Sequence, residues 1–341
     1  MKGEYPVSIE SALSNLAEGQ MKLCLSDPNT DSILLSNHFD CRVQGKGEMQ
    51  ILSLFPGVEL CFNRFIGSSV QFRHDPRENV LKINHCHLGR AGWEMQEGLT
   101  VYLGPGDLSL HPMYCCAHSQ MRLPLGYYEG ICLEVNSEAA SGWIAQHAPA
   151  FHVDFSALKQ TLLESKWYMV GSAGSRCEHV FRELYESAFY AERTYLQLKA
   201  LELLMLLDRI PQESGADAYF PSEQTELAHH LRDHLLTNRE GYVSLAQLAA
   251  EHEMSVSHLQ KLFKQVYGVP VYRYIKEYRL EQAAVELVRS RKPITEIAQR
   301  AGYDNASKFS ESFKKRYGKT PSRYRADKKL TAKRSIGNKT E

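Results

Sequence analysis

A polar stripe near the end of the chain has residue types suited to contact with nucleic-acid bases. Its members recur at i, i+3, i+4 and i+7, a spacing that places side chains on one face of a helix. They are Ser257, Gln260, Lys261 and Lys264. Glutamine can pair with adenine in the major groove, and lysine can reach guanine or a phosphate. The complementary face is apolar with the same spacing and consists of Leu259, Leu262, Phe263 and Val266.

A second set of residues with possible chemistry lies in the first half of the chain. His85 and His87 are two residues apart, so on a strand they would share one face, and Glu94 and His111 follow. Three interpretations stay open: a His/carboxylate metal site, a polar pocket for an organic effector, or histidines with structural partners only. We carry the effector pocket forward, with no metal and no other cofactor. Its candidate residues are His85, His87, Trp93, Glu94 and His111.

All eight cysteines lie between Cys24 and Cys177, and none forms a C-x-x-C pair. The start of the chain has no apolar signal segment, so the thiols are expected to stay reduced and to act as small buried hydrophobes. Adjacent residues rarely allow disulfide geometry, so Cys115 and Cys116 leave redox sensing as an alternative only.

The elements that must position the histidines are strands. Residues 50–135 contain short apolar runs separated by turn signals such as Pro56-Gly57 and Gly104-Pro105-Gly106-Asp107, a pattern typical of an antiparallel sandwich or barrel. From about residue 156 the apolar spacing becomes helical. Residues 196–207 are leucine-dense on more than one face, which predicts helices that pack on the barrel and on a second subunit.

The predicted domain organisation has two domains and a basic tail. Residues 211–221 break the periodicity with Pro, Gly and acidic residues. We therefore expect an effector-binding and dimerisation domain over 1–210, a linker over 211–222, an all-α domain over 223–326, and a flexible tail over 327–341.

The all-α domain contains an internal repeat. Leu245-Ala-Gln-Leu-Ala249 returns 49 residues later as Ile294-Thr-Glu-Ile-Ala298, and Phe263-Lys-Gln-Val-Tyr-Gly268 returns 50 residues later as Phe313-Lys-Lys-Arg-Tyr-Gly318. Two copies in register, rather than one, favour paired helix-turn-helix units over an ordinary helical bundle.

Each copy has the residues that begin and end helices. In the first, Ser244 and Ser255 are candidate caps and Gly268 is placed to stop the second helix. In the second, a helix over 295–300 is followed by a turn and a cap at Asp304 or Asn305. A helix over 278–288 would space the units so that two recognition helices fall about one DNA turn, roughly 34 Å, apart.

The distribution of charged residues along the chain supports the division into an N-terminal and a C-terminal domain. From Pro221 to the end there are 23 Lys and Arg against 14 Asp and Glu, whereas the first 220 residues hold 17 against 26. A basic C-terminal third behind an acidic remainder indicates that only the C-terminal part meets a polyanion. No window approaches the roughly 18 apolar residues of a membrane span, so we expect a cytoplasmic protein without membrane contact.

Residues from about 226 to 325 resemble the DNA-binding domain of the AraC/XylS family of bacterial transcription regulators. The matches are Ser255-Val-Ser-His-Leu-Gln-Lys-Leu-Phe-Lys264, Arg279-Leu-Glu-Gln-Ala283 and the run from Ile294 to Arg325. The resemblance implies binding to double-stranded promoter DNA with both recognition helices in successive major grooves, and activation through contact with RNA polymerase. The base-reading candidates carried over are Ser257, His258, Gln260, Lys261, Lys264, Ala306, Ser307, Lys308, Ser310 and Glu311.

The family resemblance also implies an N-terminal cupin-like β-barrel that binds a small-molecule effector, and a homodimer. The segment from His85 to Pro112 is similar to degenerate cupin motifs, best at Gly104-Pro105-Gly106-Asp107. The expected fold class is therefore α+β: a cupin-like barrel with dimerisation helices, then an all-α domain with two helix-turn-helix units. We expect an effector-responsive activator and not an enzyme. The alternatives are a repressor or dual regulator of the same family and, more remotely, a metal-dependent cupin enzyme.

Overall fold

The computed structural model describes residues 6–25, 32–33, 39–95, 98–164, 169–187, 192–207, 219–237 and 245–327. The chain forms two compact units. The first comprises residues 1–227 together with 265–268, and the second comprises residues 228–264 and 269–341. We describe each unit by itself.

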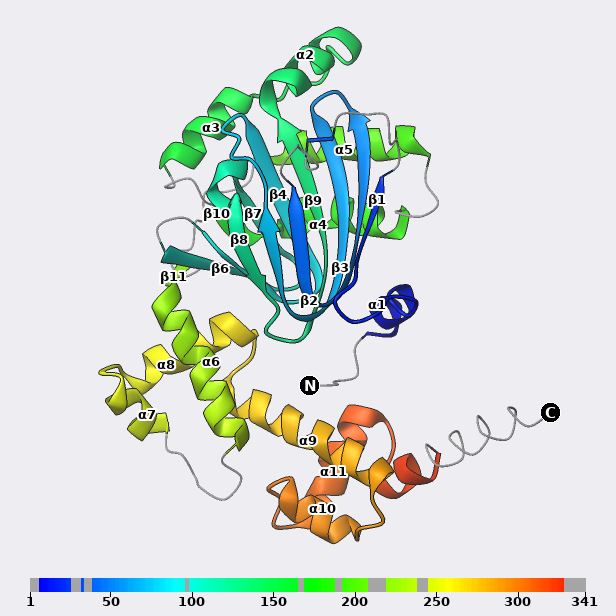
Figure 1. The fold of residues 1–341 in the computed structure, drawn as a ribbon, viewed down its shortest axis with the longest axis vertical. Helices are drawn as coiled ribbons and strands as arrows, with labels where there is room; N and C mark the ends of the chain where they lie inside the picture. Colours follow the sequence, from blue (N-terminus) through cyan, green and yellow to red (C-terminus); the bar gives the residue numbers. More distant parts are fainter. Residues whose placement is uncertain are drawn as a thin grey trace, which may run out of the picture. The chain divides into compact units, whose positions relative to one another are not determined.

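The first unit is built on one large sheet (Figure 1). Its strands are β1 (Met21–Leu25), β2 (Asp40–Phe55), β3 (Val58–Arg73), β4 (Val80–Gly89), β5 (Ala91–Glu94), β6 (Leu99–Leu103), β7 (Asp107–Pro112), β8 (His118–Arg122), β9 (Tyr127–Asn136), β10 (Met169–Ser172) and β11 (Tyr219–Pro221). The strand order is β10-β7-β4-β9-β3-β8-β5-β6-β11, with β2 on β3 and β1 parallel to β2. The sheet curves into a nearly closed barrel, with the long strand β3 paired to β2, β8 and β9 along its length.

Two apolar clusters fill the two faces of this sheet. Strand β4 shows the division, because neighbouring residues on a strand point to opposite faces. Leu81 and Ile83 belong to the outer cluster, together with residues of the helices that cover the sheet. Lys82 and Asn84 point to the inside of the barrel. The inner cluster is rich in methionine and cysteine, including Met49, Met121 and Cys132.

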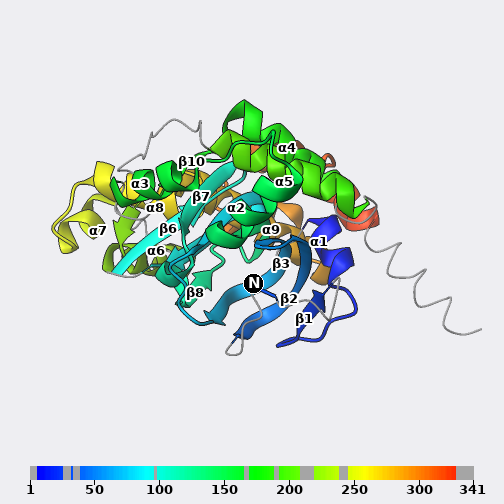
Figure 2. The same ribbon diagram turned by 90° about the horizontal axis from the view of Figure 1, so that it is seen from above.

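Helices cover the outer face of the sheet. They are α2 (Ser137–His147), α3 (Phe155–Glu164), α4 (Gly174–Ser187) and α5 (Arg193–Leu207), and a short helix α1 (Val7–Ala12) packs near β3. Figure 2 shows α4 and α5 along one side of the strands. Helix α5 buries Leu196, Ala200, Leu203 and Leu207 against the sheet and α4.

The second unit is helical in the part that the structure describes. It contains α6 (Ser222–Thr237, from Ala228), α7 (Leu245–Glu251), α8 (Val256–Tyr267, to Lys264), α9 (Val271–Arg289), α10 (Ile294–Arg300) and α11 (Ala306–Tyr317). Residues 321–327 add a further turn of helix. The predicted fold class, a barrel followed by an all-α domain, is confirmed.

Three details differ from the sequence prediction or fall outside the described residues. Strand β10 interrupts the region predicted to be helical, because its backbone pairs with β7. Strand β11 occupies residues predicted as linker and pairs with β6. The cap candidate Ser244, linker residues 211–218 and tail residues 328–341 lie outside the described residues, and the predicted domain boundaries stay predictions.

Candidate functional site

The first helix-turn-helix unit consists of α7 and α8. The chain leaves α7 through Glu253, whose φ is 52°, and the backbone N–H of Met254 donates to the carbonyl of Ala249 at 2.9 Å. Ser255 then begins α8, with its Oγ accepting from the backbone N–H of His258 at 3.1 Å. The predicted cap is thus confirmed, and Gly268 follows the helix with a φ of 77° that favours glycine.

Helix α8 separates its polar and apolar side chains as the sequence predicts. Leu259, Leu262 and Phe263 are buried. The side chains of the polar stripe are exposed, namely Ser257, Gln260, Lys261 and Lys264. His258, the remaining candidate on this helix, is half-buried. An exposed polar face above a firmly packed apolar one can enter a groove without loss of the fold.

The second unit consists of α10 and α11. Gly302, with a φ of 80°, makes the turn between them, and the side chain of Asn305 begins α11. The Oδ1 atom of Asn305 accepts from the backbone N–H groups of Ser307 at 2.7 Å and Lys308 at 3.3 Å. Of the two predicted caps, Asn305 is therefore the one used. Gly318 ends the helix in the left-handed conformation.

Fewer of the predicted base-reading residues are exposed on α11 than on α8. Ser307, Lys308 and Glu311 are exposed. Ala306 is half-buried and packs on the apolar cluster of this unit, and the Oγ of Ser310 donates to the carbonyl of Ala306 at 2.8 Å. Ser310 is therefore engaged within its own helix, and fewer of the candidates on α11 than on α8 project outward.

Helix α9 connects the two helix-turn-helix units by direct packing. Near its start, the ring of Tyr274 meets Phe263 of α8 edge-on at a centroid distance of 5.5 Å. Near its end, Leu280 and Leu287 join the cluster that contains Phe309 and Phe313 of α11. The helix begins seven residues earlier than the predicted residue 278, at Val271, which directly follows Pro270. Proline favours helix starts because it needs no N–H partner there.

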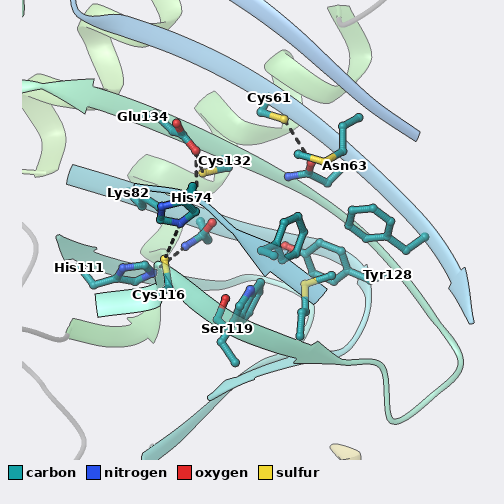
Figure 3. A pocket seen from close by; sticks show the side chains of 16 residues that line it. Cys61, Asn63, His74, Lys82, His111, Cys116, Ser119, Tyr128, Cys132 and Glu134 are labelled. Carbon is teal, nitrogen blue, oxygen red and sulfur yellow. Dashed lines mark hydrogen bonds and ion pairs between the residues drawn. The ribbon is translucent and has the colours of Figure 1, made fainter. Parts of the chain in front are cut away.

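The inside of the barrel in the first unit holds a small cavity (Figure 3). Its lining combines aromatic, sulfur-containing and polar side chains, all from the strands and the loops next to them. They are Met49, Cys61, Asn63, Phe65, Phe72, His74, Lys82, Asn84, Trp93, His111, Cys116, Ser119, Met121, Tyr128, Cys132 and Glu134. An apolar enclosure with a few convergent polar groups is typical of a small-molecule site.

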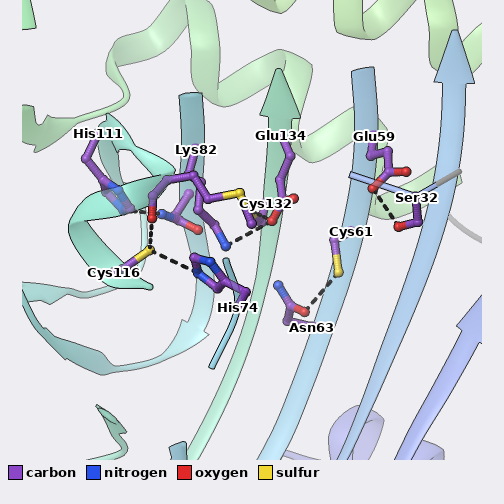
Figure 4. A network of polar contacts seen from close by, with 12 residues as sticks. Ser32, Glu59, Cys61, Asn63, His74, Lys82, His111, Cys116, Cys132 and Glu134 are labelled. Atoms are coloured by element: carbon purple, nitrogen blue, oxygen red, sulfur yellow. Dashed lines mark hydrogen bonds and ion pairs between the residues drawn. The ribbon is translucent and has the colours of Figure 1, made fainter. Parts of the chain in front are cut away.

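A buried ion pair stands at the centre of the polar side (Figure 4). The Nζ of Lys82 lies 2.9 Å from the Oε1 of Glu134, and the Glu134 side chain is 1% exposed. Burial lowers the pKa of Lys82, but Glu134 together with the neighbouring Cys116 and Cys132 raises that pKa well above its usual value. Lys82 therefore stays charged, and its ammonium group pairs with the carboxylate of Glu134.

Two neutral histidines flank this pair. Burial lowers the pKa of His74 and of His111 to about 4, and the charge of Lys82 acts in the same direction. The Nδ1 of His111 donates to the carbonyl of Pro112 at 3.1 Å, which leaves Nε2 to accept from the Nδ2 of Asn84 at 3.2 Å. The Nδ1 of His74 makes the same kind of bond to the carbonyl of Asp75 at 3.0 Å.

The structure divides the five predicted effector residues. Trp93 and His111 line the cavity. His85 and His87 share a face, as predicted, but it is the outer one: both rings contact Tyr185 of α4, and the Nε2 of His85 lies 2.9 Å from Glu178. The prediction that they point into the pocket was wrong, because residue 85 alternates with the inward residues 82 and 84.

Glu94 is also outside the cavity lining and pairs with Arg122 at 3.3 Å. The set His85, His87, Glu94 and His111 is therefore not brought together. In the described part of the chain, no three His, Cys, Asp or Glu side chains are grouped as metal ligands.

The sequence reasoning missed the residues that carry the cavity's charge. They are Lys82 on β4 and Glu134 on β9. Lys82 is two residues from Asn84, and Glu134 is two residues from Cys132, so each shares a face of its strand with another residue of the cavity wall. This spacing was the signal available in the sequence. The buried thiols of Cys116 and Cys132 also line the cavity, and burial raises the pKa of Cys116 to about 11.

Of the described helices, none is long and apolar enough to cross a membrane.

Comparison with known proteins supports the interpretation of the C-terminal region. Residues 248–327 match the model of a helix-turn-helix domain family. A paired helix-turn-helix domain with exposed polar recognition faces defines a class of DNA-binding proteins. This match supports the resemblance of the C-terminal region to the AraC/XylS family.

Individual relatives match the same kind of domain. The transcriptional regulator Rob of Salmonella typhimurium is 37% identical over 90 residues, which cover 26% of this chain and 31% of Rob. The arabinose operon regulatory protein of Escherichia coli is 32% identical over 143 residues, 41% of this chain and 48% of that protein. The chain thus spans about a third to a half of these relatives. The C-terminal domain of AraT, a response regulator from Geobacillus stearothermophilus, is 30% identical and covers 30% of this chain and 84% of that chain, with a TM-score of 0.28.

Proposed function

We propose that this protein is a transcription regulator that binds double-stranded promoter DNA through α8 and α11. The observation that carries the proposal is the exposed stripe of Ser257, Gln260, Lys261 and Lys264 on a helix whose other face is buried. Relatives of the C-terminal domain are named as transcription regulators, which agrees with this assignment and with the expectation that the chain is not an enzyme.

The two recognition helices are proposed to contribute unequally. Helix α8 offers an amide and two ammonium groups to the groove, whereas α11 offers Ser307, the ammonium groups of Lys308 and Lys314, and the acidic Glu311. A carboxylate is repelled by phosphates unless it accepts from a cytosine amino group. We therefore assign most of the base reading to α8, and positioning on the backbone to α11.

The test is a mobility-shift assay on the promoter fragment that the wild-type protein selects from a fragment library. Gln260→Ala is expected to weaken binding by about 1–3 kcal/mol and to relax specificity at one base pair. Lys261→Ala should weaken binding by a similar amount, and if it contacts a phosphate it should reduce the salt slope by about 1.

Matched controls exist on α9, where Gln282 and Lys276 are exposed. Gln282→Ala and Lys276→Ala remove the same chemical groups outside the recognition helices, so wild-type specificity is expected for both. Wild-type affinity in Gln260→Ala and Lys261→Ala, on the same fragment, would remove the assignment of α8.

The remaining parts of the proposed function concern partners. We propose a homodimer through α5, since Leu198 and Met205 are seven residues apart and are 53% and 36% exposed. We also propose a small-molecule effector in the barrel, activation through contact with RNA polymerase, and action in the cytoplasm. Native mass spectrometry tests the first: Leu198→Lys should shift the protein toward monomer, and a wild-type protein that is monomeric at micromolar concentration would contradict the dimer.

A further inference from the structure

One buried oxygen in the barrel has no partner. The Oε1 of Glu134 receives Lys82 at 2.9 Å and the thiol of Cys132 at 3.8 Å. The Oε2 of the same carboxylate has no hydrogen-bond partner among the residues that the structure describes, although Glu134 is 1% exposed. An unsatisfied buried acceptor of this kind destabilises a fold, so a group with a hydrogen to donate is expected beside it.

The charge of the cavity restricts what that group can be. Lys82 and Glu134 are the charged residues among those lining it, and they cancel. Burial keeps His74 and His111 neutral, and the carbonyls of Asp75 and Pro112 fix the remaining ring proton of each on Nδ1. A ligand with a full charge would enter an enclosed space with no free counter-charge, which is strongly unfavourable.

The same ion pair offers two complementary positions to a neutral group. Glu134 Oε2 can accept, while the Lys82 ammonium has three hydrogens, one of which its contact with Glu134 Oε1 uses. A hydroxyl or a primary amide both donates and accepts, so a single such group satisfies both.

Part of the remaining wall is aromatic. The ring of Tyr128 stacks on Phe65 at 6.3 Å and meets Trp93 edge-on at 5.9 Å. Phe72 completes this side of the cavity. Such a surface favours an unsaturated or cyclic apolar body.

We propose that the barrel binds a neutral, compact cyclic molecule whose hydroxyl or amide group donates to Glu134 and accepts from Lys82. The inference rests on the proposed function, in which the barrel is an effector domain, and it names the chemical class of that effector.

The test uses three probes of the same shape and different charge: benzyl alcohol, benzoate and benzylammonium. Binding to the full chain is measured by ligand-observed NMR and calorimetry up to about 10 mM, which suits millimolar dissociation constants. Benzyl alcohol is expected to bind at least about tenfold more tightly than either ion, since each ion would be buried without a counter-charge.

Charge-changing variants should invert this order. Glu134→Gln leaves Lys82 without its balance, so benzoate should gain at least about tenfold relative to benzyl alcohol; Lys82→Met should give the same gain to benzylammonium. The control is Glu183→Gln, which removes a partner of Lys199 from the ion pair on α4 and α5, away from the cavity, and should leave the order unchanged.

The wild-type order decides the question even if neither cavity variant folds. Tightest binding of benzoate or of benzylammonium overturns the proposal. Absence of measurable binding by all three probes also overturns it, and assigns the cavity to buried water alone. DNA binding by the same preparation is measured separately, so a wrong ligand class is distinguishable from a failure of the proposed regulator function.

Discussion

The neutral state of the buried histidines predicts that the barrel loses stability in mild acid. The pKa of His111 is about 4 in the fold against 6.5 in its absence, because burial disfavours the imidazolium and Asn84 already donates to the Nε2 atom. The unfolded chain therefore binds a proton more readily than the folded one between these values. The stabilisation is complete above pH 6.5 and is lost as the pH falls from 6.5 to 4.

The size of the effect follows from the same values. Between pH 7 and pH 5, a histidine shifted from 6.5 to 4 reduces the free energy of unfolding by about 2 kcal/mol, and His74 adds a similar amount. His111→Gln removes one titrating group, so the variant should lose about 2 kcal/mol less than the wild type over this range. The intrinsic cost of the substitution cancels, because only the difference between the two pH values is compared.

Urea unfolding followed by tryptophan fluorescence measures this loss for the first unit alone. All three tryptophans of the chain precede residue 227, so the signal does not report on the second unit. His152→Gln serves as the control for the substitution itself, since His152 is exposed. An equal loss between pH 7 and pH 5 in wild type and His111→Gln would refute the assignment of a neutral, titrating His111.

Three further predictions follow from contacts in the two units. Asn305→Ala should lower the free energy of unfolding of the second unit by about 0.5–2 kcal/mol, with Asn305→Asp near wild type, as measured by circular dichroism at 222 nm. Gly302→Ala and Gly318→Ala should each lower that free energy by about 1–2 kcal/mol in the same assay, because both glycines have positive φ and the Arg279 Nη1 atom near a Cβ at 302 can move aside; a cost near zero at either position would contradict this. A thiol reagent should modify the six buried cysteines only on unfolding, and rapid native modification of more than two thiols would show that the cavity wall opens.

The sequence was sufficient for the recognition helices because their signals are local. Ser255 and Asn305 each bond to backbone groups two or three residues away, and Gly268 and Gly318 adopt the conformation that glycine permits. The earlier start of α9 at Val271 also had a local signal in Pro270, which the apolar spacing alone did not include.

The barrel site could not be predicted in the same way. Alternation along β4 shows that His85 and Lys82 face opposite sides, but not which side is the interior. That choice is made by α4, which supplies Phe181 to stack on His85 at 4.0 Å. The residues that carry the cavity's charge, Lys82 and Glu134, are 52 positions apart and meet only because β4 pairs with β9.

The length of α9 has a consequence for how this protein and its DNA sites can change together. Its 19 residues span about 28 Å, and each end is packed into a different helix-turn-helix unit. Inserting one residue into α9 would advance the second helix-turn-helix unit by about 1.5 Å and rotate it by about 100° relative to the first. One extra base pair between half-sites advances the DNA by about 3.4 Å and turns it by about 34°. No single insertion in the helix compensates for a single insertion in the operator, so the spacing of the site is locked, and new targets must be gained by substitution within the half-sites.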